Sequence, residues 1–397
     1  MLTGCTTDGI QKPKKTRDNG EKLTIYYAQD SFNMNRAVSS YNRVAKEECK
    51  LEAYEGDADT LATEVLAGKG PDLFLFGRLD FDNLYNYVGK GVFQDLNYYF
   101  EQDPVDWNKY NTAITDAGVF GGKRYLLPYS YFMDLYVTTD KTLESCGIPE
   151  DIQLIRTEYS DLLSYQESIK AQGMKMFSKA PSNSLMSLAQ NYMDYDNKTS
   201  HFNSEEFRNA IEKQKELAQI SGAVQQATFP NDKYVFTEVP IACMSYVWSE
   251  YAGKIPDERE LLYSQRDEKN GGYLADVNCC VAINANSANG KRAFEFVKWL
   301  MREDTQWNED ITDNPINLDA VDWQLTNVWR DYRSESEDLK QQYMDIIHNI
   351  TVCKIRDTKF YYSVFSTLWQ DYKDDKITLD TFVKELDNKA SLYLQEL

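Results

Sequence analysis

Aromatic side chains with a polar tip are the residues of this sequence best suited to do chemistry. The 397-residue chain contains 28 Tyr, 7 Trp and 18 Phe. A sugar ring stacks its apolar C–H faces on aromatic rings, while Asp, Asn, Arg and Gln side chains hydrogen-bond its rim of hydroxyl groups. The composition is therefore suited to sugar binding, provided that these residue types gather in loops around a ligand.

The usual signatures of catalysis do not occur in the sequence. Only two histidines are present, His201 and His348, and the chain has neither an HExxH nor a GxSxG motif. Residues 118–123 are rich in glycine, but their spacing does not match a phosphate-binding loop, and Arg124 stands where that loop requires Ser or Thr. Among 63 acidic residues, close carboxylate pairs arise by chance, and none is singled out for glycoside hydrolysis. We predict no catalytic residue, no metal site and no cofactor.

Composition and charge exclude several other classes of protein. Hydrophobic residues make up 42% and charged residues 27% of the chain, as in ordinary globular proteins. The net charge of −20 repels a phosphate backbone, so we expect no nucleic-acid partner. No apolar run approaches the ~18–20 residues that span a bilayer. The length corresponds to roughly two to three domains.

Six cysteines follow Cys5, scattered and without C-x-x-C spacing. We predict that most are small buried hydrophobes. A disulfide between Cys49 and Cys146 stays an open alternative. Zinc binding by Cys279 and Cys280 is disfavoured, because neighbours on a strand point to opposite faces of the sheet.

Strands and helices alternate from residue 22 onward. Apolar, β-branched and aromatic runs predict strands at 23–27, 51–54 and 72–76, and apolar spacings of three and four predict a helix after each. Continuous apolar strands between helices favour a parallel sheet covered on both faces, with ligands beyond the carboxyl ends of its strands.

The remainder of the chain follows a different pattern. Residues 129–137 are aromatic and predicted to be extended, and residues 150–235 are predicted to be largely helical. A strand at 277–283 precedes a helix that begins near Lys291. The last third is predicted to be helical and ends with Phe382, Leu386 and Ala390 at four-residue spacing.

Six segments, taken in order, carry a family likeness: GPDL with YVGKGVFQDL (70–73, 87–96), GGKRYLLP (121–128), MDYDN with FNSEEF (193–197, 202–207), IACMSYVW (241–248), residues 291–306, and NPIN (314–317). Together they resemble the extracellular solute-binding proteins of family 1, the ABC-importer group that includes maltose-binding protein. The resemblance spans the chain after residue 22. The chain departs from the pattern at Asp375, where the family commonly has Gly, and at Val239-Pro240, where a Gly-Lys pair is usual; both departures put only local loop shape in doubt.

The resemblance implies a two-lobed, periplasmic-binding-protein-like α/β fold of type II, with a ligand cleft between lobes that are joined by hinge strands. We place the N-terminal lobe at 23–133 plus 277–320 and the C-terminal lobe at 134–276 plus 321–397. The chain is expected to cross between lobes near 132–137, near 273–277 and near Ala320.

The resemblance also implies ligand-binding residues. Trp248 matches the family's aromatic platform after its "aM" strand and turn, with Tyr246 two residues earlier on the same face. Tyr361 and Tyr362 fall where the family tends to place its last aromatic contact. For Trp248 the alternative is packing in the core.

Four polar residues are further candidates. Gln29 and Asp30 lie in the first strand-to-helix loop, where the family often has polar ligand groups, although Asp30 would also suit a helix cap. Arg78 and Asp80 follow the buried strand that ends at Phe76, and could instead pair with each other.

Tyr129 and Tyr131 complete the candidate ligand residues. They come just after Pro128 at the expected first crossing, and strand alternation places both on one side. Packing within the core is the alternative for both tyrosines.

The N-terminal residues Leu2–Cys5 (LTGC) resemble a bacterial lipobox, in which the leader is cut before Cys5 and its thiol receives a lipid. Residues 6–22 are polar and basic, which is typical of a flexible tether beside an anionic membrane. We therefore expect a protein on the extracellular face of the bacterial cell membrane, held there only by its lipid.

The resemblance implies a substrate-binding lipoprotein of an ABC importer, a monomer that captures a sugar or oligosaccharide by hinge closure and delivers it to the permease subunits. No enzyme activity is expected. The alternatives are a surface glycoside hydrolase, or the same fold binding a peptide or a polyamine.

Overall fold

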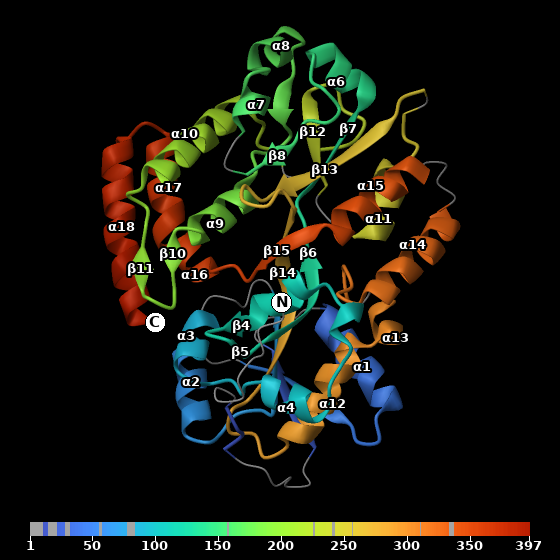
Figure 1. Cartoon of the computed structure of the whole chain (residues 1–397), viewed down its shortest axis with the longest axis vertical. Helices are drawn as coiled ribbons and strands as arrows, with labels where there is room; N and C mark the ends of the chain where they lie inside the picture. The colour runs from blue at the N-terminus through green and yellow to red at the C-terminus, as the bar shows by residue number, and fades with distance from the viewer. Residues whose placement is uncertain are drawn as a thin grey trace, which may run out of the picture. The chain divides into compact units, whose positions relative to one another are not determined.

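The computed structural model describes residues 11–14, 22–27, 32–54, 58–77, 84–156, 159–224, 227–239, 243–255, 257–309, 311–332 and 337–397 (Figure 1). The chain divides into two compact units. Unit 1 comprises the described residues of Met1–Tyr131 and Val277–Val321 together with Leu397, and unit 2 comprises those of Phe132–Asp276 and Asp322–Glu396. Both units combine a sheet with helices, as the sequence predicts.

The sheet of unit 1 has the strand order β2-β1-β3-β14-β6. These strands are β1 (Leu23–Tyr27), β2 (Cys49–Ala53), β3 (Leu73–Gly77), β6 (Leu127–Phe132) and β14 (Tyr273–Ile283). β1 pairs in parallel with β2 and β3, whereas β14 is antiparallel to β3 and β6. The expected all-parallel sheet is therefore wrong at β14. This strand enters from unit 2 and follows no crossover helix, so the requirement that makes β1, β2 and β3 parallel does not apply to it.

Helices cover this sheet as the apolar spacings predict. Unit 1 contains α1 (Phe32–Val44), α2 (Ala58–Leu66), α3 (Leu84–Gly89), α4 (Asn97–Gln102), α5 (Thr112–Thr115), α12 (Gly290–Met301), α13 (Glu303–Gln306), and the hairpin of β4 (Val119–Phe120) with β5 (Lys123–Arg124). Helices α1 and α12 lie side by side, with the rings of Tyr41 and Phe296 centred 4.9 Å apart (Figure 1). Aromatic residues Phe74, Phe76 and Phe93 form the core next to β3.

One buried glutamine ties the NPIN segment into unit 1. Gln306 donates from Nε2 to the carbonyl oxygens of Tyr129, at 3.0 Å, and Leu300, at 2.8 Å. Its Oε1 accepts from the backbone N–H groups of Ile316 and Asn317. All of the hydrogen-bonding capacity of the amide is thereby used inside the core. Nothing in the sequence pattern predicts this role for Gln306.

The sheet of unit 2 is built around β7 (Leu135–Thr139), which lies between β12 (Tyr234–Val239) and β13 (Glu260–Arg266) and is antiparallel to both. β9 (Lys175–Phe177) extends it in parallel beside β12, β8 (Leu154–Ile155) runs parallel to β13, and β15 (Ile350–Lys354) runs parallel to the first residues of β14. The core of the unit gathers between these strands and the neighbouring helices, with the rings of Tyr136 and Phe177 centred 5.0 Å apart.

The helices of unit 2 come from two stretches of the chain. They are α6 (Asp140–Cys146), α7 (Ser160–Leu163), α8 (Gln166–Ala171), α9 (Ser182–Gln190), α10 (Glu205–Ile220), α11 (Met244–Tyr251), α15 (Glu337–His348), α16 (Thr358–Phe360), α17 (Ser366–Lys373) and α18 (Leu379–Glu396), with the hairpin β10 (Met193–Asp194) and β11 (Thr199–Ser200). Helices α17 and α18 pack together at the C-terminal end of the chain (Figure 1). Residues 150–235 are less helical than expected, because five short strands interrupt them.

The chain passes between the units at three places: at the end of β6, within β14, and within α14 (Leu318–Tyr332). A single strand, β14, therefore contributes its first four residues to unit 2 and its last seven to unit 1.

The six cysteines after Cys5 are free thiols, and Cys49, Cys146, Cys279 and Cys280 are buried, so the structure contains no Cys49–Cys146 disulfide.

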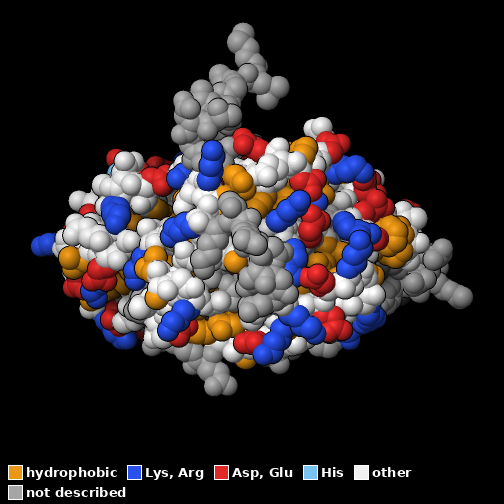
Figure 2. Space-filling model, turned by 90° about the horizontal axis from the view of Figure 1, so that it is seen from below, with side chains coloured by type: hydrophobic (Ala, Val, Ile, Leu, Met, Phe, Trp, Pro, Cys, Tyr) orange, Lys and Arg blue, Asp and Glu red, His pale blue; other side chains and the backbone are white. Residues whose placement is uncertain are grey.

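Charged side chains of both signs are interspersed with small hydrophobic areas on the face drawn in Figure 2. The net charge of −20 is thus not spread as a uniformly negative surface there, and a local binding surface can differ from it. None of the helices in the described part of the chain is long and apolar enough to cross a membrane.

A buried guanidinium connects three elements of unit 2. Arg156, just after β8, is fully buried and donates to Ser187 Oγ of α9 at 2.8 Å and to both carboxylate oxygens of Glu268 at 3.1 Å. Its backbone carbonyl accepts from Gln214 of α10. Removing the guanidinium alone would leave a nearly buried carboxylate without its counter-charge.

We expect Arg156→Met to lower the free energy of unfolding by about 3–5 kcal/mol, because breaking a buried ion pair on one side strands the other charge. Arg259→Met is the control, since Arg259 pairs with Glu150 and Asp338 at a half-exposed site and should cost about 0–1 kcal/mol. Urea unfolding followed by circular dichroism measures both variants. Equal costs for the two would contradict the role assigned to Arg156.

Candidate functional site

Five of the residues predicted to have a functional role lie outside the described residues. They are Gln29, Asp30, Arg78 and Asp80, predicted to contact ligand, and Cys5, predicted to carry a lipid. The strands that precede these positions in the sequence are described: β1 ends at Tyr27 and β3 ends at Gly77. Because β1 and β3 are parallel neighbours, their carboxyl ends lie at the same edge of the sheet of unit 1.

Tyr129 and Tyr131 lie in the core of unit 1. Both side chains are buried, as is every residue of β6. The strand is therefore covered on both faces. Burial raises the pKa of the Tyr129 hydroxyl well above its ordinary value, with Cys279 adding to the effect. Their position supports the packing alternative.

The segment that holds Tyr246 and Trp248 is a helix, α11, and not the expected strand and turn. Residues two positions apart on a helix point in different directions, so the prediction that both share one face is wrong. Trp248 is 2% exposed and packs edge-on against Tyr343 of α15, with ring centres 5.4 Å apart. Tyr246, in the first turn of α11, is only partly buried.

Tyr361 and Tyr362 begin a π-helical turn, η5 (Tyr361–Phe365), between α16 and α17. Single π-helical turns inside α-helices occur frequently at functional sites. Tyr361 stacks on Phe365, with ring centres 5.6 Å apart, whereas Tyr362 points outward and is 62% exposed. Burial, and then Tyr362, raises the pKa of Tyr361 to about 12, so its hydroxyl stays a hydrogen-bond donor at neutral pH.

A buried carboxylate holds the start of this turn. Asp357 caps α16 by accepting from the backbone N–H of Phe360 at 2.9 Å, and also accepts from the hydroxyls of Tyr195, at 2.9 Å, and Tyr393, at 2.8 Å. Burial raises the pKa of Asp357 to about 6 in spite of these donors. The turn carrying Tyr361 and Tyr362 is therefore anchored to α18 and to the β10–β11 hairpin.

Arg356 lies beside this turn and is bound from two sides. Its Nη2 donates to Asp276 Oδ2 at 2.6 Å, and its guanidinium lies over the ring of Phe132, 4.4 Å from the ring centre. Burial lowers the pKa of the guanidinium, but Asp276 outweighs this and raises it, with smaller contributions from Asp134 and Tyr362. Arg356, which directly precedes Asp357, thus contacts β14 through Asp276 and the last residue of β6 through Phe132.

Two carboxylates, Asp134 and Glu238, lie at the adjoining ends of β7 and β12. Asp134 directly precedes β7, and Glu238 of β12 pairs in register with Tyr136. Burial, and then Asp134, raises the pKa of Glu238 to about 7, although Lys179, 3.6 Å away, opposes the shift. The Oε2 atom of Glu238 is buried without a hydrogen-bond partner among the residues that the structure describes.

Electrostatic effects extend this set to two tyrosines of α11. The rings of Tyr246 and Tyr251 are 6.1 Å apart, and burial, followed by Tyr246, Glu250 and Glu238, raises the pKa of the Tyr251 hydroxyl. Carboxylates, a guanidinium and tyrosines of unit 2 are thus linked through their effects on one another's pKa values: Asp134 acts on Glu238 and Arg356, Tyr362 on Arg356 and Tyr361, and Glu238 on Tyr251. We call this set the acidic–aromatic cluster; its members are Asp134, Glu238, Tyr246, Tyr251, Arg356, Tyr361 and Tyr362.

The cluster has the chemistry of a polyhydroxyl-binding surface. Carboxylates accept hydrogen bonds from hydroxyl groups, Arg356 supplies fixed donors, and the exposed ring of Tyr362 offers a stacking face. Sequence reasoning found three of the tyrosines but missed Asp134, Glu238 and Arg356. One feature of the sequence could have indicated a special role for Glu238: it is the only charged residue in the strand YVFTEV.

A family model described as "Bacterial extracellular solute-binding protein" matches residues 44–331. None of the curated proteins matches the chain. Among solved structures, the chain is similar to a cyclic α-maltosyl-1,6-maltose binding protein from Arthrobacter globiformis, with 16% identity, a TM-score of 0.64, and coverage of 95% of this chain and 100% of the other.

Two further similar structures have bound ligands. An ABC substrate-binding protein from Listeria monocytogenes in complex with cycloalternan has 14% identity and a TM-score of 0.60, covering 96% of this chain and 100% of the other. An ABC transporter solute-binding protein from Thermotoga lettingae bound with α-D-tagatose has 13% identity and a TM-score of 0.60, covering 94% and 100%. These likenesses confirm the expected fold class, a two-lobed periplasmic-binding-protein-like α/β fold.

The raised pKa of Glu238 predicts a pH-dependent stability. Its ordinary value is 4.5 and its folded value about 7, so between these values the folded protein binds more protons than the unfolded chain. The free energy of unfolding therefore falls as pH rises from 4.5 to 7 and stays low above. Glu238→Gln removes this loss, and we expect the variant to be about 1–3 kcal/mol more stable than the parent at pH 8 but little changed at pH 4.5.

Urea unfolding at the two pH values measures the effect. Glu144→Gln, an exposed glutamate of α6, is the control and should shift neither value. A stability difference for Glu238→Gln that is the same at both pH values would contradict the prediction.

Proposed function

Because the chain belongs to the bacterial extracellular solute-binding proteins, we propose that it is the substrate-binding lipoprotein of an ABC importer, which captures a sugar or oligosaccharide outside the cell. Its partners are the solute and the permease subunits of the importer. Cys5 carries the lipid that holds the protein at the extracellular face of the cell membrane, and the protein acts as a monomer.

The acidic–aromatic cluster is the observation that carries the sugar proposal. Within it, the exposed Tyr362 and the carboxylate of Asp134 both raise the pKa of the buried Arg356 guanidinium, which supports a shared role for the three residues. A sugar stacks on such a ring while the charged groups hydrogen-bond its hydroxyls. The ligands named for the similar structures, cyclic oligosaccharides and tagatose, agree with this chemistry.

The ligand residues we propose are of two kinds. Within the cluster, Tyr246, Tyr361 and Tyr362 were predicted from the sequence. To these we add the charged residues of the cluster, Asp134, Glu238 and Arg356. Gln29, Asp30, Arg78 and Asp80 stay proposed on the strength of the family resemblance and of their sequence positions after β1 and β3. Tyr129, Tyr131 and Trp248 are assigned to packing because they are buried.

Capture requires a difference in affinity between two states. If the ligand binds the closed form more tightly than the open form, binding shifts the population to the closed form by that difference. Hinge closure then presents the loaded protein to the permease. No chemical step on the solute is needed, so the protein releases the solute unchanged.

Glycoside hydrolysis is the second candidate, and one observation favours it. Glu238, with its raised pKa, lies near Asp134, and a glycoside hydrolase needs a protonated carboxyl group beside an ionised one. Family membership favours capture. The two functions differ in whether the sugar is recovered intact.

We expect the melting temperature to rise with ligand concentration for one class of sugar in a panel of mono- and oligosaccharides, polyamines and short peptides. A ligand that binds only the folded state stabilises it in this way. Chromatography of the sugar after incubation should recover it intact. If a polyamine or a peptide stabilises the protein instead, that compound is the solute and the sugar proposal is wrong. If the sugar is consumed, the protein is a hydrolase and the capture proposal is wrong.

Once a ligand is known, Tyr362→Ala should raise its Kd about tenfold, equivalent to about 1–2 kcal/mol, through lost stacking. Tyr362→Phe keeps the ring and should retain most of the affinity. Trp323→Ala removes another exposed aromatic side chain, one outside the cluster, and should leave Kd unchanged. Calorimetric titration measures the three variants, and an unchanged Kd for Tyr362→Ala would remove this residue from the site.

A further inference from the structure

The N-terminal segment Gln11–Lys14 lies against unit 1, although residues 6–22 are predicted to be a flexible tether. The backbone N–H of Gln11 donates to Asp95 Oδ2 at 3.3 Å, and its carbonyl oxygen accepts from Gln94 Nε2 at 2.6 Å. Both backbone polar groups of Gln11 are thus held by two neighbouring side chains of unit 1.

The two receiving side chains are buried and fixed. Gln94 is 1% exposed and Asp95 is fully buried. Asp95 Oδ1 accepts from the backbone N–H groups of Asn97, at 3.0 Å, and Arg124, at 3.2 Å, which hold the start of α4 to β5. The other oxygen, Oδ2, is directed to Gln11. A carboxylate that accepts from backbone N–H groups forms stronger hydrogen bonds than a neutral acceptor.

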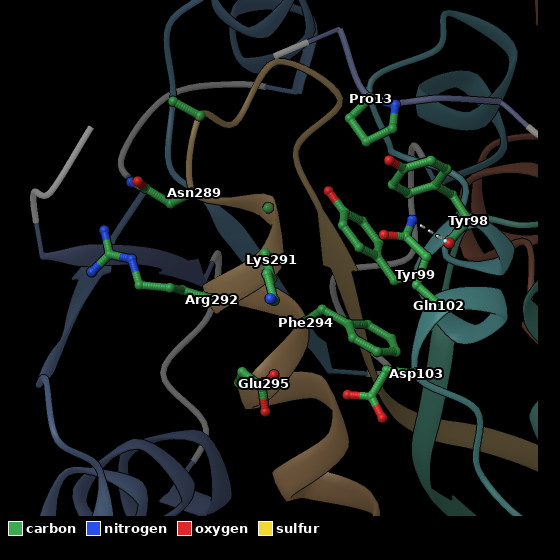
Figure 3. A pocket seen from close by; sticks show the side chains of 12 residues that line it. Pro13, Tyr98, Tyr99, Gln102, Asp103, Asn289, Lys291, Arg292, Phe294 and Glu295 are labelled. Atoms are coloured by element: carbon green, nitrogen blue, oxygen red, sulfur yellow. Dashed lines mark hydrogen bonds between the residues drawn. The ribbon is translucent and has the colours of Figure 1, made fainter. Parts of the chain in front are cut away.

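A cavity of about 240 Å³ continues the contact from Gln11 to Pro13. Figure 3 shows the ring of Pro13 beside Tyr98, with Tyr99 and Phe294 deeper in the cavity. Tyr99 stacks on Phe294, with ring centres 5.3 Å apart, and its hydroxyl occupies the place that a Cβ at Gly290 would take. The first turn of α12 and the helix α4 therefore form a preshaped recess next to the backbone contact.

We propose that Gln11–Lys14 is a strap that docks on unit 1, with its backbone held by Gln94 and Asp95 and Pro13 seated in the recess between α4 and α12. The chain that leaves the anchor is then fixed to one face of unit 1. Among the residues that the structure describes, no predicted ligand residue lines this recess.

The strap determines which surface faces the membrane. This consequence rests on the proposed lipid at Cys5. Gln11 follows Cys5 by six residues, and an extended chain spans at most ~3.6 Å per residue, so the anchor lies within about 20 Å of the strap. The partner of the surface formed by α4 and the β4–β5 hairpin is accordingly the lipid bilayer.

A matched pair of substitutions within the strap tests docking without altering the body. Gln11→Pro removes the N–H that donates to Asp95, whereas Gln11→Ala keeps both backbone groups. We expect trypsin to cut slowly after Lys14 in the parent and in Gln11→Ala, and several-fold faster in Gln11→Pro. Mass spectrometry of the full-length protein follows the cut, and synthetic peptides of residues 6–22 with each substitution correct for any direct effect on trypsin.

A second pair of substitutions lies in unit 1, on the side that the strap contacts. Gln94→Met removes the donor to Gln11 and should expose the strap to trypsin, whereas Gln102→Met, at the exposed rim of the same recess, should not. If the parent is cut as fast as Gln11→Pro, the strap is not docked and the proposal fails.

Membrane orientation is measured separately on lipidated protein bound to phosphatidylcholine–phosphatidylglycerol vesicles. A dye on Lys123→Cys, in β5, should be quenched by a lipid-borne quencher several-fold more than a dye on Glu167→Cys, in α8 of unit 2. Equal quenching overturns the orientation. Absence of vesicle binding overturns the lipid anchor of the proposed function, and the trypsin result then decides the strap by itself.

Discussion

The hydrogen-bond register of β14 is the constraint on which both units depend. Its residues 277–283 complete the sheet of unit 1 between β3 and β6, and its first four residues pair with β15 in unit 2. A register shift of one residue would turn every side chain of such a strand to the opposite face. The buried Asp276, at the boundary, is bound to Arg356, so the strand is fixed at the position where it leaves unit 2. The candidate site is built on this fixed point.

Most of the buried charged side chains described above in unit 2 are stabilised by ion pairs or hydrogen bonds. Arg156 and Arg356 each bind a carboxylate and a second group, and Asp357 accepts three hydrogen bonds. Glu238 is the exception, because one of its oxygens is buried without a partner among the described residues and its pKa is raised. A buried carboxylate with a raised pKa that also acts on Tyr251 is the kind of group that clusters at functional sites, which agrees with the proposed sugar site. The network around it supplies the rigidity that such a site needs.

The roles proposed for unit 1 and unit 2 are different. Unit 2 carries the acidic–aromatic cluster, while unit 1 carries the strap that Gln94 and Asp95 hold. If the lipid anchor fixes unit 1 to the membrane through the strap, unit 2 is the unit that moves when the ligand binds. The basic tether segment then works as a short connection with a defined attachment, and the acidic bulk of the protein stands away from an anionic surface.

The local elements and the family could be predicted from the sequence alone. The strand predicted at 23–27 is β1, and the apolar spacings of Phe382, Leu386 and Ala390 match the buried face of α18, because periodicity reports directly which face of an element is apolar. Six weak motifs in a fixed order identified the family, although none is specific alone. The tertiary structure was needed to show that β14 is antiparallel, that Trp248 lies in a helix against Tyr343, and that Asp134 acts on the pKa values of both Glu238 and Arg356. Periodicity does not report what covers an apolar face or which distant side chains converge, and both depend on long-range packing.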